Sequence, residues 1–203
     1  MPWLEDLKFS PDARYLAVSS HDSKLRVYAF VNGHERLDLY CTLSASTAFI
    51  SHVDWSADSN YLRTNDGSYE LLYYDVQHKN QVVNAVRNAS QSNKPNMKDV
   101  EWATTTCPIT WATQGVWARG MDGTDINHCD RSGDSHPDGY QLLATGDDFG
   151  QVKIFRYPAM VEPSQAVVCR GHSSHVTKVK FGAGSLFSTG GNDGCVIQWK
   201  LEM

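Results

Sequence analysis

A repeated unit in the second half of the chain places the strongest constraint on its fold. Residues 145–155 recur as residues 189–199, with Gly150 matched by Gly194, at a constant offset of 44 residues. Each copy has two short strand-like runs of alternating residues on either side of a tight polar turn. A period of about 40–45 residues with glycine–aspartate turns and a closing aromatic residue is typical of propeller blades. Because one four-stranded blade cannot bury both of its faces, such blades must stack around a common axis.

The first half of the chain repeats at a similar spacing. Phe9 corresponds to Trp55 and Asp12 to Asp58, and the members of each pair are 46 residues apart. The run Ser-Pro-Asp-Ala at 10–13 predicts a turn between strands, because proline presets φ and serine or aspartate bonds the nearby backbone. The sequence therefore predicts an all-β protein of about four WD-repeat β-propeller blades, which lie at about 4–45, 48–107, 122–168 and 171–203.

A polar excursion interrupts the second predicted blade. Residues 77–98 are rich in Asn, Ser and Gln, which is typical of an exposed loop. Residues 100–107 have the threonine and aromatic content of an outer strand. For Trp102, Trp111 and Trp117 two interpretations stay open. They pack the insertion onto its own blade, or one of them contributes to a partner surface, where tryptophan is enriched.

Charge and composition argue against several classes of protein. The net charge of −5 and the scattered positions of the 18 Lys and Arg residues disfavour a nucleic-acid partner bound through phosphates. No apolar run approaches the ~18 residues of a membrane span, and the first residues lack a signal-peptide pattern. The five cysteines include no Cys-x-x-Cys pair and are odd in number. We expect a soluble cytoplasmic protein with reduced, half-buried strand cysteines.

Several segments resemble one family of WD-repeat proteins. The run Asp-Gly-Thr-Asp-Ile-Asn at 122–127 and the run Thr-Gly-Asp-Asp-Phe-Gly at 145–150 are far more specific than a general WD signature. Through them the chain is similar to the C-terminal WD repeats of echinoderm microtubule-associated protein-like (EML) proteins over nearly its whole length. The other segments that carry the resemblance are 9–12, 69–73, 101–107, 114–117, 171–177 and 188–193.

The resemblance implies a tandem atypical β-propeller that associates with tubulin and microtubules in the cytoplasm, the spindle or the ciliary axoneme. It implies a non-enzymatic scaffold that binds tubulin or microtubule-bound proteins. A general WD-repeat adaptor not tied to microtubules is the alternative. Family members carry an upstream hydrophobic segment and often a coiled coil, and neither is found in these 203 residues. The chain therefore looks like the C-terminal part of a longer propeller.

The last repeat unit also predicts an incomplete propeller. Its third strand is at the end of the sequence, so its outermost strand must come from elsewhere. Open apolar faces and unpaired strand edges promote aggregation. We expect the remaining blades to come from further sequence or from another chain. A closed ring of four blades is the alternative, because propellers range from four to eight blades.

A buried hydrogen-bond chain is expected in the last blade. His172 follows a glycine and lies 27 residues before Trp199, which is similar to the spacing in WD repeats. From that similarity we expect His172, Thr189, Asp193 and Trp199 to bond to one another. Their role would be structural, because a buried polar group without a partner costs about 1–3 kcal/mol.

Three arrangements with chemical potential have weak support. Ser173, His175 and Asp193 lack the surroundings of a nucleophile elbow. The adjacent acids at 147–148 are more typical of a turn that caps backbone N–H groups than of a metal site. The pair His172 and His175 lacks a third ligand nearby. We expect no catalytic, metal or cofactor site, and an enzyme or small-ligand binder that uses the central channel is the second functional class.

Loops are the expected binding surface of such a protein, because blades form a rigid frame and binding residues are usually on the loops. The surface of a microtubule is acidic, so an acidic chain must bind it through local complementarity. The candidates for a partner surface are Trp111, Trp117, Arg119, Asp147, Asp148, Phe149 and Asn192.

Overall fold

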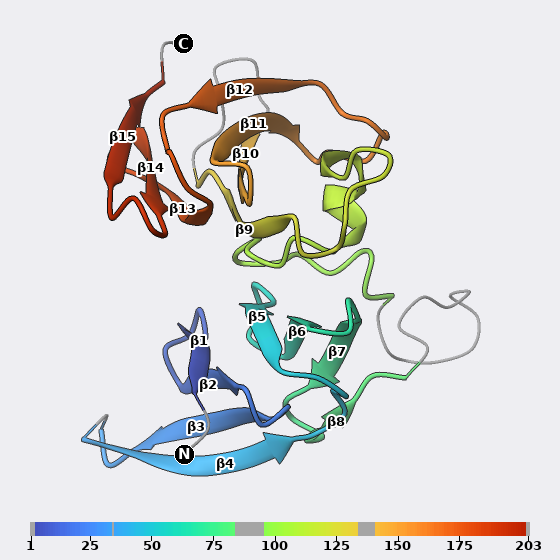
Figure 1. Ribbon diagram of the computed structural model, residues 1–203. Coiled ribbons are helices and arrows are strands. Elements are labelled where there is room, and N and C mark those ends of the chain that lie inside the picture. The colour runs from blue at the N-terminus through green and yellow to red at the C-terminus, as the bar shows by residue number, and fades with distance from the viewer. Residues whose placement is uncertain (1–2, 34, 84–95, 134–140, 202–203) are drawn as a thin grey trace. The chain divides into compact units, whose positions relative to one another are not determined.

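The computed structural model describes residues 3–33, 35–83, 96–133 and 141–201. Strands form nearly all of the regular structure in these ranges, and η1 (Trp111–Val116) is the one helix among them. The strands form four antiparallel sheets (Figure 1), so the predicted all-β fold of four propeller blades is confirmed. The chain divides into two compact units, Met1–Cys107 and Pro108–Met203, each with two of the sheets. No described helix is long and apolar enough to cross a membrane.

Unit 1 contains two sheets in which neighbouring strands follow one another along the chain. The first sheet has the order β1 (Leu4–Phe9), β2 (Tyr15–Ser20), β3 (Leu25–Val31) and β4 (Arg36–Leu43). The second has the order β5 (Ile50–Trp55), β6 (Tyr61–Asp66), β7 (Leu71–Asp75) and β8 (Asn80–Gln81). Antiparallel neighbours need only short connections, and the local turns supply them.

The turn between the first two strands of each sheet in unit 1 is built in the same way. In each turn an aspartate, Asp12 or Asp58, accepts hydrogen bonds from a preceding serine hydroxyl at 2.6 Å and from a backbone N–H two residues later at 3.0 Å. The residue after each aspartate, Ala13 or Ser59, has a positive φ of 57° or 63°. The spacing of 46 residues therefore reflects one turn geometry used twice.

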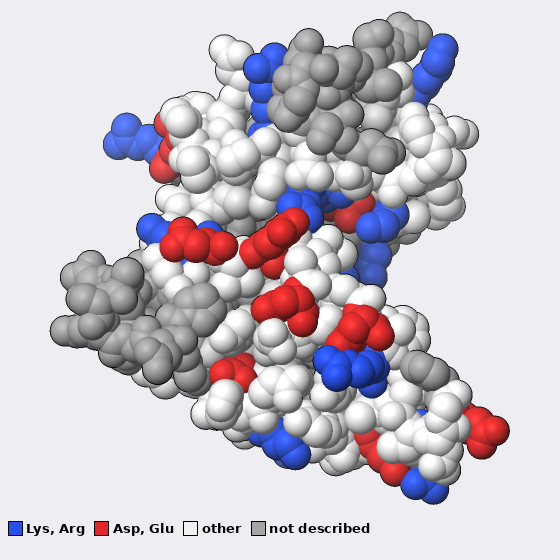
Figure 2. Space-filling view, turned by 180° about the vertical axis from the view of Figure 1, so that it is seen from behind, with Lys and Arg blue, Asp and Glu red and all other residues white. Residues whose placement is uncertain are grey.

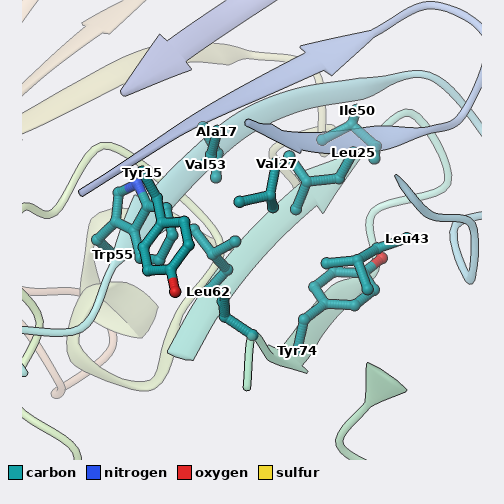
Figure 3. Close-up of a cluster of buried hydrophobic side chains, with 11 residues drawn as sticks. Tyr15, Ala17, Leu25, Val27, Leu43, Ile50, Val53, Trp55, Leu62 and Tyr74 are labelled. Carbon is teal, nitrogen blue, oxygen red and sulfur yellow. The ribbon is translucent and has the colours of Figure 1, made fainter. Parts of the chain in front are cut away.

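The core of unit 1 lies between its two sheets. Figure 3 shows Tyr15 beside Trp55, with their ring centroids 6.1 Å apart and their planes within 20°. The Trp55 indole N–H donates to the Lys8 carbonyl at 2.9 Å, so its one polar atom is satisfied within the core. Burial of each large apolar side chain stabilises the fold by about 1.5–3 kcal/mol. The other buried members of this core are Ala17, Leu25, Val27, Leu43, Ile50, Val53, Leu62, Tyr74 and Val76.

Unit 2 contains one sheet of four strands and one of three. The first consists of β9 (Ile126–Arg131), β10 (Gln141–Asp147), β11 (Gln151–Tyr157) and β12 (Ala166–Arg170). The second consists of β13 (Val176–Gly182), β14 (Ser185–Gly190) and β15 (Val196–Lys200). Within the described residues, β15 pairs on one side only, with β14.

Two apolar clusters hold unit 2 together. The cluster between its sheets includes Ala144, Val152, Val176, Val179 and Leu186. The other lies between η1 and the four-stranded sheet, and its buried members are Val116, Ile126, Cys129, Leu143, Phe155 and Ala159. This packing requires a glycine at position 146, in the repeated Thr-Gly pair. A Cβ there would lie only 2.5 Å from Val176 Cγ1.

The segment 100–107 is not the outer strand that its composition predicts, and that prediction was wrong. The outermost strand of this blade is β8, which falls within the expected excursion 77–98. Residues 84–95 of that excursion lie outside the described part of the chain. The segment instead makes one isolated bridge, between Trp102 and Ser56, at the end of the inner strand β5. Trp102 packs onto its own blade, with its ring centroid 5.7 Å from that of Tyr73.

All five cysteines are free thiols. Cys41 and Cys169 are half-buried, as expected. Cys107 and Cys129 are fully buried and Cys195 is exposed, so the half-buried position expected for these three was wrong. Cys107 donates weakly to the Arg63 carbonyl at 3.9 Å. Burial raises the pKa of the Cys107 thiol well above its usual range, and the negative charge of Asp54 adds to the effect. This thiol is therefore protonated and unreactive.

Candidate functional site

Four side chains of the last blade form a buried hydrogen-bond chain. The His172 ring bonds to Asp193 Oδ2 through Nδ1 at 2.9 Å and to Ser188 Oγ through Nε2 at 2.7 Å. Ser188 Oγ also accepts the Trp199 indole N–H at 2.8 Å. If the imidazole is neutral, Nδ1–H donates to the carboxylate and Nε2 accepts from the serine hydroxyl. Every polar atom in this chain then has a partner.

The chain runs through Ser188 and not through Thr189, so the expected set requires a correction. Successive residues of a strand point to opposite faces of the sheet. Ser188 points toward the blade interior with His172, while the Thr189 hydroxyl bonds to Thr177 Oγ1 at 2.7 Å. The sequence similarity located the correct blade and three of the four partners, but it misplaced the strand residue by one position.

The order Ser188–His172–Asp193 is that of a nucleophilic triad, but its setting is different. The side chain of His172 has no exposed surface, and Ser188 is 1% exposed. The Ser188 oxygen is held by Trp199 as well as by the histidine. A nucleophile must reach its substrate, so this buried chain fits a structural role better than a catalytic one.

The alternative Ser173–His175 arrangement also serves local structure. Ser173 donates its backbone N–H to Asp193 Oδ2 at 3.1 Å. The Cys195 backbone N–H and the His172 ring together lower the pKa of Asp193. His175 Nδ1 bonds to Ser174 Oγ at 3.1 Å. Within the described residues, no group of three or more His, Cys, Asp or Glu side chains is placed to hold a metal ion.

Asp147 and Asp148 have different environments, although they are adjacent in sequence. Asp147 is buried, accepts the backbone N–H groups of Phe149 and Gln151 at 3.0 and 2.8 Å, and bonds to Lys153 Nζ at 2.8 Å. It therefore shapes the turn between β10 and β11 and is not part of a surface, contrary to its place among the candidate partner residues. Asp148 is exposed.

The exposed turns of the two blades in unit 2 lie side by side and form one surface. Asn127 Nδ2 joins Asp148 Oδ1 at 2.7 Å to the Val176 carbonyl at 3.0 Å. The Asn192 N–H donates to Ser174 Oγ at 3.2 Å. The side chain of Phe149 is 66% exposed. We call Asp148, Phe149, Ser174 and Asn192 the turn surface.

The three candidates around η1 belong to another part of unit 2. Ala159, after the far end of β11, bonds to the backbone of η1, so η1 lies at the opposite end of β11 from Phe149. Trp117 is half-buried against the apolar cluster and donates its indole N–H to the Pro108 carbonyl at 3.1 Å. Trp111 is 40% exposed, and Arg119 is exposed. The structure therefore separates these residues from the turn surface.

Unit 1 contains a buried polar network that sequence reasoning missed. Asp54 on β5 has no exposed side-chain surface and bonds to Arg63 Nε at 3.1 Å. It also accepts the Thr104 hydroxyl at 2.5 Å and the Cys107 backbone N–H at 3.1 Å. Lys8 Nζ, from the other sheet, lies 3.5 Å from the same carboxylate. The segment after the excursion is thus anchored to the centre of unit 1.

The charges of this network stabilise one another. Burial alone would raise the pKa of Asp54, but the positive charges of Lys8 and Arg63 outweigh it and hold that pKa well below its usual range. Burial alone would lower the pKa of Lys8, but Asp54 and Asp6 raise it. The Arg63 guanidinium also lies 4.5 Å from the ring centroid of Trp102. All three groups are ionised at neutral pH, and each depends on the others.

A match to one protein-family model determines the family of this chain. Residues 1–201 match the family model described as the second β-propeller of echinoderm microtubule-associated protein. This chain belongs to the EML family. The resemblance seen in the sequence is therefore confirmed.

Named EML relatives cover almost the whole chain. The 77 kDa echinoderm microtubule-associated protein of Lytechinus variegatus is 39% identical over 197 residues, which are 96% of this chain and 28% of that protein. Echinoderm microtubule-associated protein-like 2 of Homo sapiens has the same identity and coverage. Echinoderm microtubule-associated protein-like 1 of Mus musculus is 38% identical over 200 residues, 98% of this chain and 23% of that protein. The chain thus spans about a quarter of the length of these relatives.

Both acidic and basic side chains lie on the surface of this EML chain (Figure 2). Figure 2 shows one face of the molecule, on which acidic and basic side chains are interspersed. Many of the basic groups are paired with acids, for example Arg26 with Asp22 and Lys180 with Asp130 at 2.8 Å. Such a surface favours recognition through local contacts over long-range attraction of an acidic partner.

Proposed function

We propose that this EML chain is a non-enzymatic scaffold that binds tubulin or proteins bound to microtubules. The observation that carries the proposal is the match of residues 1–201 to an EML propeller, with 38–39% identity to proteins named for their association with microtubules. Its place would be the cytoplasm and the microtubule cytoskeleton, including the ciliary axoneme. The polar chain around His172 is buried, which supports a scaffold over an enzyme.

The turn surface is the proposed site of contact in unit 2. Phe149 offers an exposed aromatic ring, its neighbour Asp148 is exposed, and Asn192 is exposed on the turn of the next blade. Aromatic anchors surrounded by polar residues are typical of the centre of a protein interface. The buried polar chain of the last blade supports the turn that carries Asn192, because Asp193 accepts the backbone N–H groups of Ser173 and Cys195.

A second contact is proposed for the first sheet of unit 1, where further propeller blades would pack. Leu7, Phe9 and Leu39 are 58, 56 and 56% exposed, and Phe9 stacks on Phe30 with the ring centroids 5.9 Å apart. A set of exposed apolar side chains on one sheet face indicates an interaction site. The relatives are about four times as long as this chain, so further sequence is one available source of those blades, and a second chain is the other.

Co-sedimentation with stabilised microtubules tests the proposal. The wild-type chain should bind with saturation, and Phe149→Ala should weaken binding about fivefold or more, as expected for an aromatic anchor. Val161→Ala is the matched control, because Val161 is exposed in unit 2 but lies outside the turn surface. A wild-type chain that stays in the supernatant, yet captures other proteins through Phe149, would support the general WD-repeat adaptor instead.

A further inference from the structure

Three aromatic rings gather at one end of unit 1, away from its core. The rings of His21 and Phe49 are stacked with centroids 4.7 Å apart and planes within 7°. The Trp3 ring meets His21 edge-on, with the centroids 5.3 Å apart. Glu5 bonds to His21 Nε2. We call Trp3, Glu5, His21 and Phe49 the aromatic patch.

The backbone holds this patch in place. The Trp3 carbonyl accepts the His21 N–H at 2.9 Å and the Ser20 hydroxyl at 3.1 Å. The Phe49 ring lies over Gly67, where an added Cβ would come within 2.5 Å of Phe49 Cε1, and the Gly67 N–H donates to the Phe49 carbonyl. The rings therefore need little reordering when a ligand arrives, which lowers the entropic cost of binding.

The chemistry of the patch is aromatic and acidic. Trp3 is 73% exposed, so a large face of its indole is open to a ligand. The Glu5 carboxylate is about one-third exposed beside it. A second carboxylate, that of Glu70, lies near this end of unit 1. Its Oε2 accepts the hydroxyl of Thr47, two residues before Phe49, at 3.3 Å. The nearby Arg26 is already paired with Asp22.

We propose that the aromatic patch binds a lysine or arginine side chain of a partner protein. A cation over the face of tryptophan is attracted by the ring quadrupole, and a neighbouring carboxylate adds an ion pair. The charge of the patch is complementary to a basic segment, and a chain of net charge −5 adds no long-range repulsion toward it. This proposal stands apart from the turn surface of unit 2 and does not depend on microtubule binding.

Binding of fluorescein-labelled hexa-arginine to the whole 203-residue chain, followed by fluorescence anisotropy, tests the proposal. Trp3→Ala should weaken binding about fivefold to tenfold, and Trp3→Phe should restore part of it, since phenylalanine keeps a weaker cation-binding face. Trp111→Ala is the matched control, because Trp111 is an exposed tryptophan of unit 2. It should leave the affinity unchanged.

A second pair of variants examines the carboxylate. Glu5→Gln should weaken binding about twofold to fivefold and reduce its dependence on salt, while the exposed Glu101→Gln should not. If Trp3→Ala and Trp111→Ala lost the same amount of affinity for hexa-arginine, the binding would be non-specific and the proposal would be overturned. Equal affinity for a neutral glycine–serine hexapeptide would also overturn it. Circular dichroism of each variant separates these results from misfolding.

Discussion

The two units each contain a buried polar network, but the two networks connect residues at different separations along the sequence. In unit 2 the His172 chain is local, with separations of 21 residues to Asp193 and 16 to Ser188. In unit 1 the Asp54 carboxylate joins residues 52 positions away, such as Thr106, and Lys8 from the other sheet. A local network braces the turns of one blade. The long-range network holds together two sheets and the segment that leaves them.

The networks also differ in charge. Asp54 is fully buried between two cations, whereas the His172 chain contains one carboxylate and otherwise uncharged donors and acceptors when the imidazole is neutral. A buried charge that loses its partner is more costly than a neutral group that loses a hydrogen bond. The comparison therefore predicts that unit 1 depends more strongly on one side chain than unit 2 does.

The largest effect is expected from Asp54→Ala. The substitution leaves Lys8 and Arg63 without their shared carboxylate, so the free energy of unfolding should fall by about 3–5 kcal/mol. Urea unfolding followed by tryptophan fluorescence measures this loss. Glu101→Gln, an exposed change in the same unit, should stay within about 0.5 kcal/mol of wild type. A loss below about 1 kcal/mol for Asp54→Ala would contradict the role assigned to the carboxylate.

The pH dependence of the free energy of unfolding tests the contribution of Asp54 in a second way. The pKa of Asp54 is depressed in the folded state, so its stabilisation is complete above the unfolded-state pKa of about 3.9. It is lost as the pH falls from there toward the folded-state pKa. Urea unfolding between pH 6 and pH 2.5 should therefore show a steeper decline below pH about 4 for wild type than for Asp54→Asn. Parallel curves for the two proteins would show that Asp54 does not carry this dependence.

The same contrast explains how much could be predicted from sequence. Local signals were sufficient for the blades, because turns such as that around Asp12 and Asp58 repeat their hydrogen bonds at a fixed spacing. The role of Asp54 could not be predicted, since several of its partners, such as Thr104 and Thr106, are 50 and 52 residues away in the sequence. The only local signal was an aspartate between the apolar residues Val53 and Trp55 of β5.

Two expectations were wrong where tertiary contacts, and not the local sequence, decide the role of a residue. Asp147 and Asp148 are neighbours in a polar turn, and only the structure shows that the first points inward to Lys153. The segment 100–107 has the composition of a strand, but it does not form one. The hydroxyls of Thr104 and Thr106 instead donate to the Asp54 carboxylate. Composition reports what a segment prefers, while tertiary contacts decide what it does.

The smallest predicted effect concerns two adjacent residues of β14 and examines the local network. Ser188→Ala removes the partner of both His172 Nε2 and the Trp199 indole, so the free energy of unfolding should fall by about 1–3 kcal/mol. Thr189→Val removes only the bond to Thr177 on the half-exposed face, and it should cost less than about 1 kcal/mol. Urea unfolding of both variants measures the difference. A larger loss for Thr189→Val than for Ser188→Ala would contradict this assignment. It would mean that Thr189, as the WD-repeat spacing predicts, and not Ser188, belongs to the hydrogen-bond chain of His172.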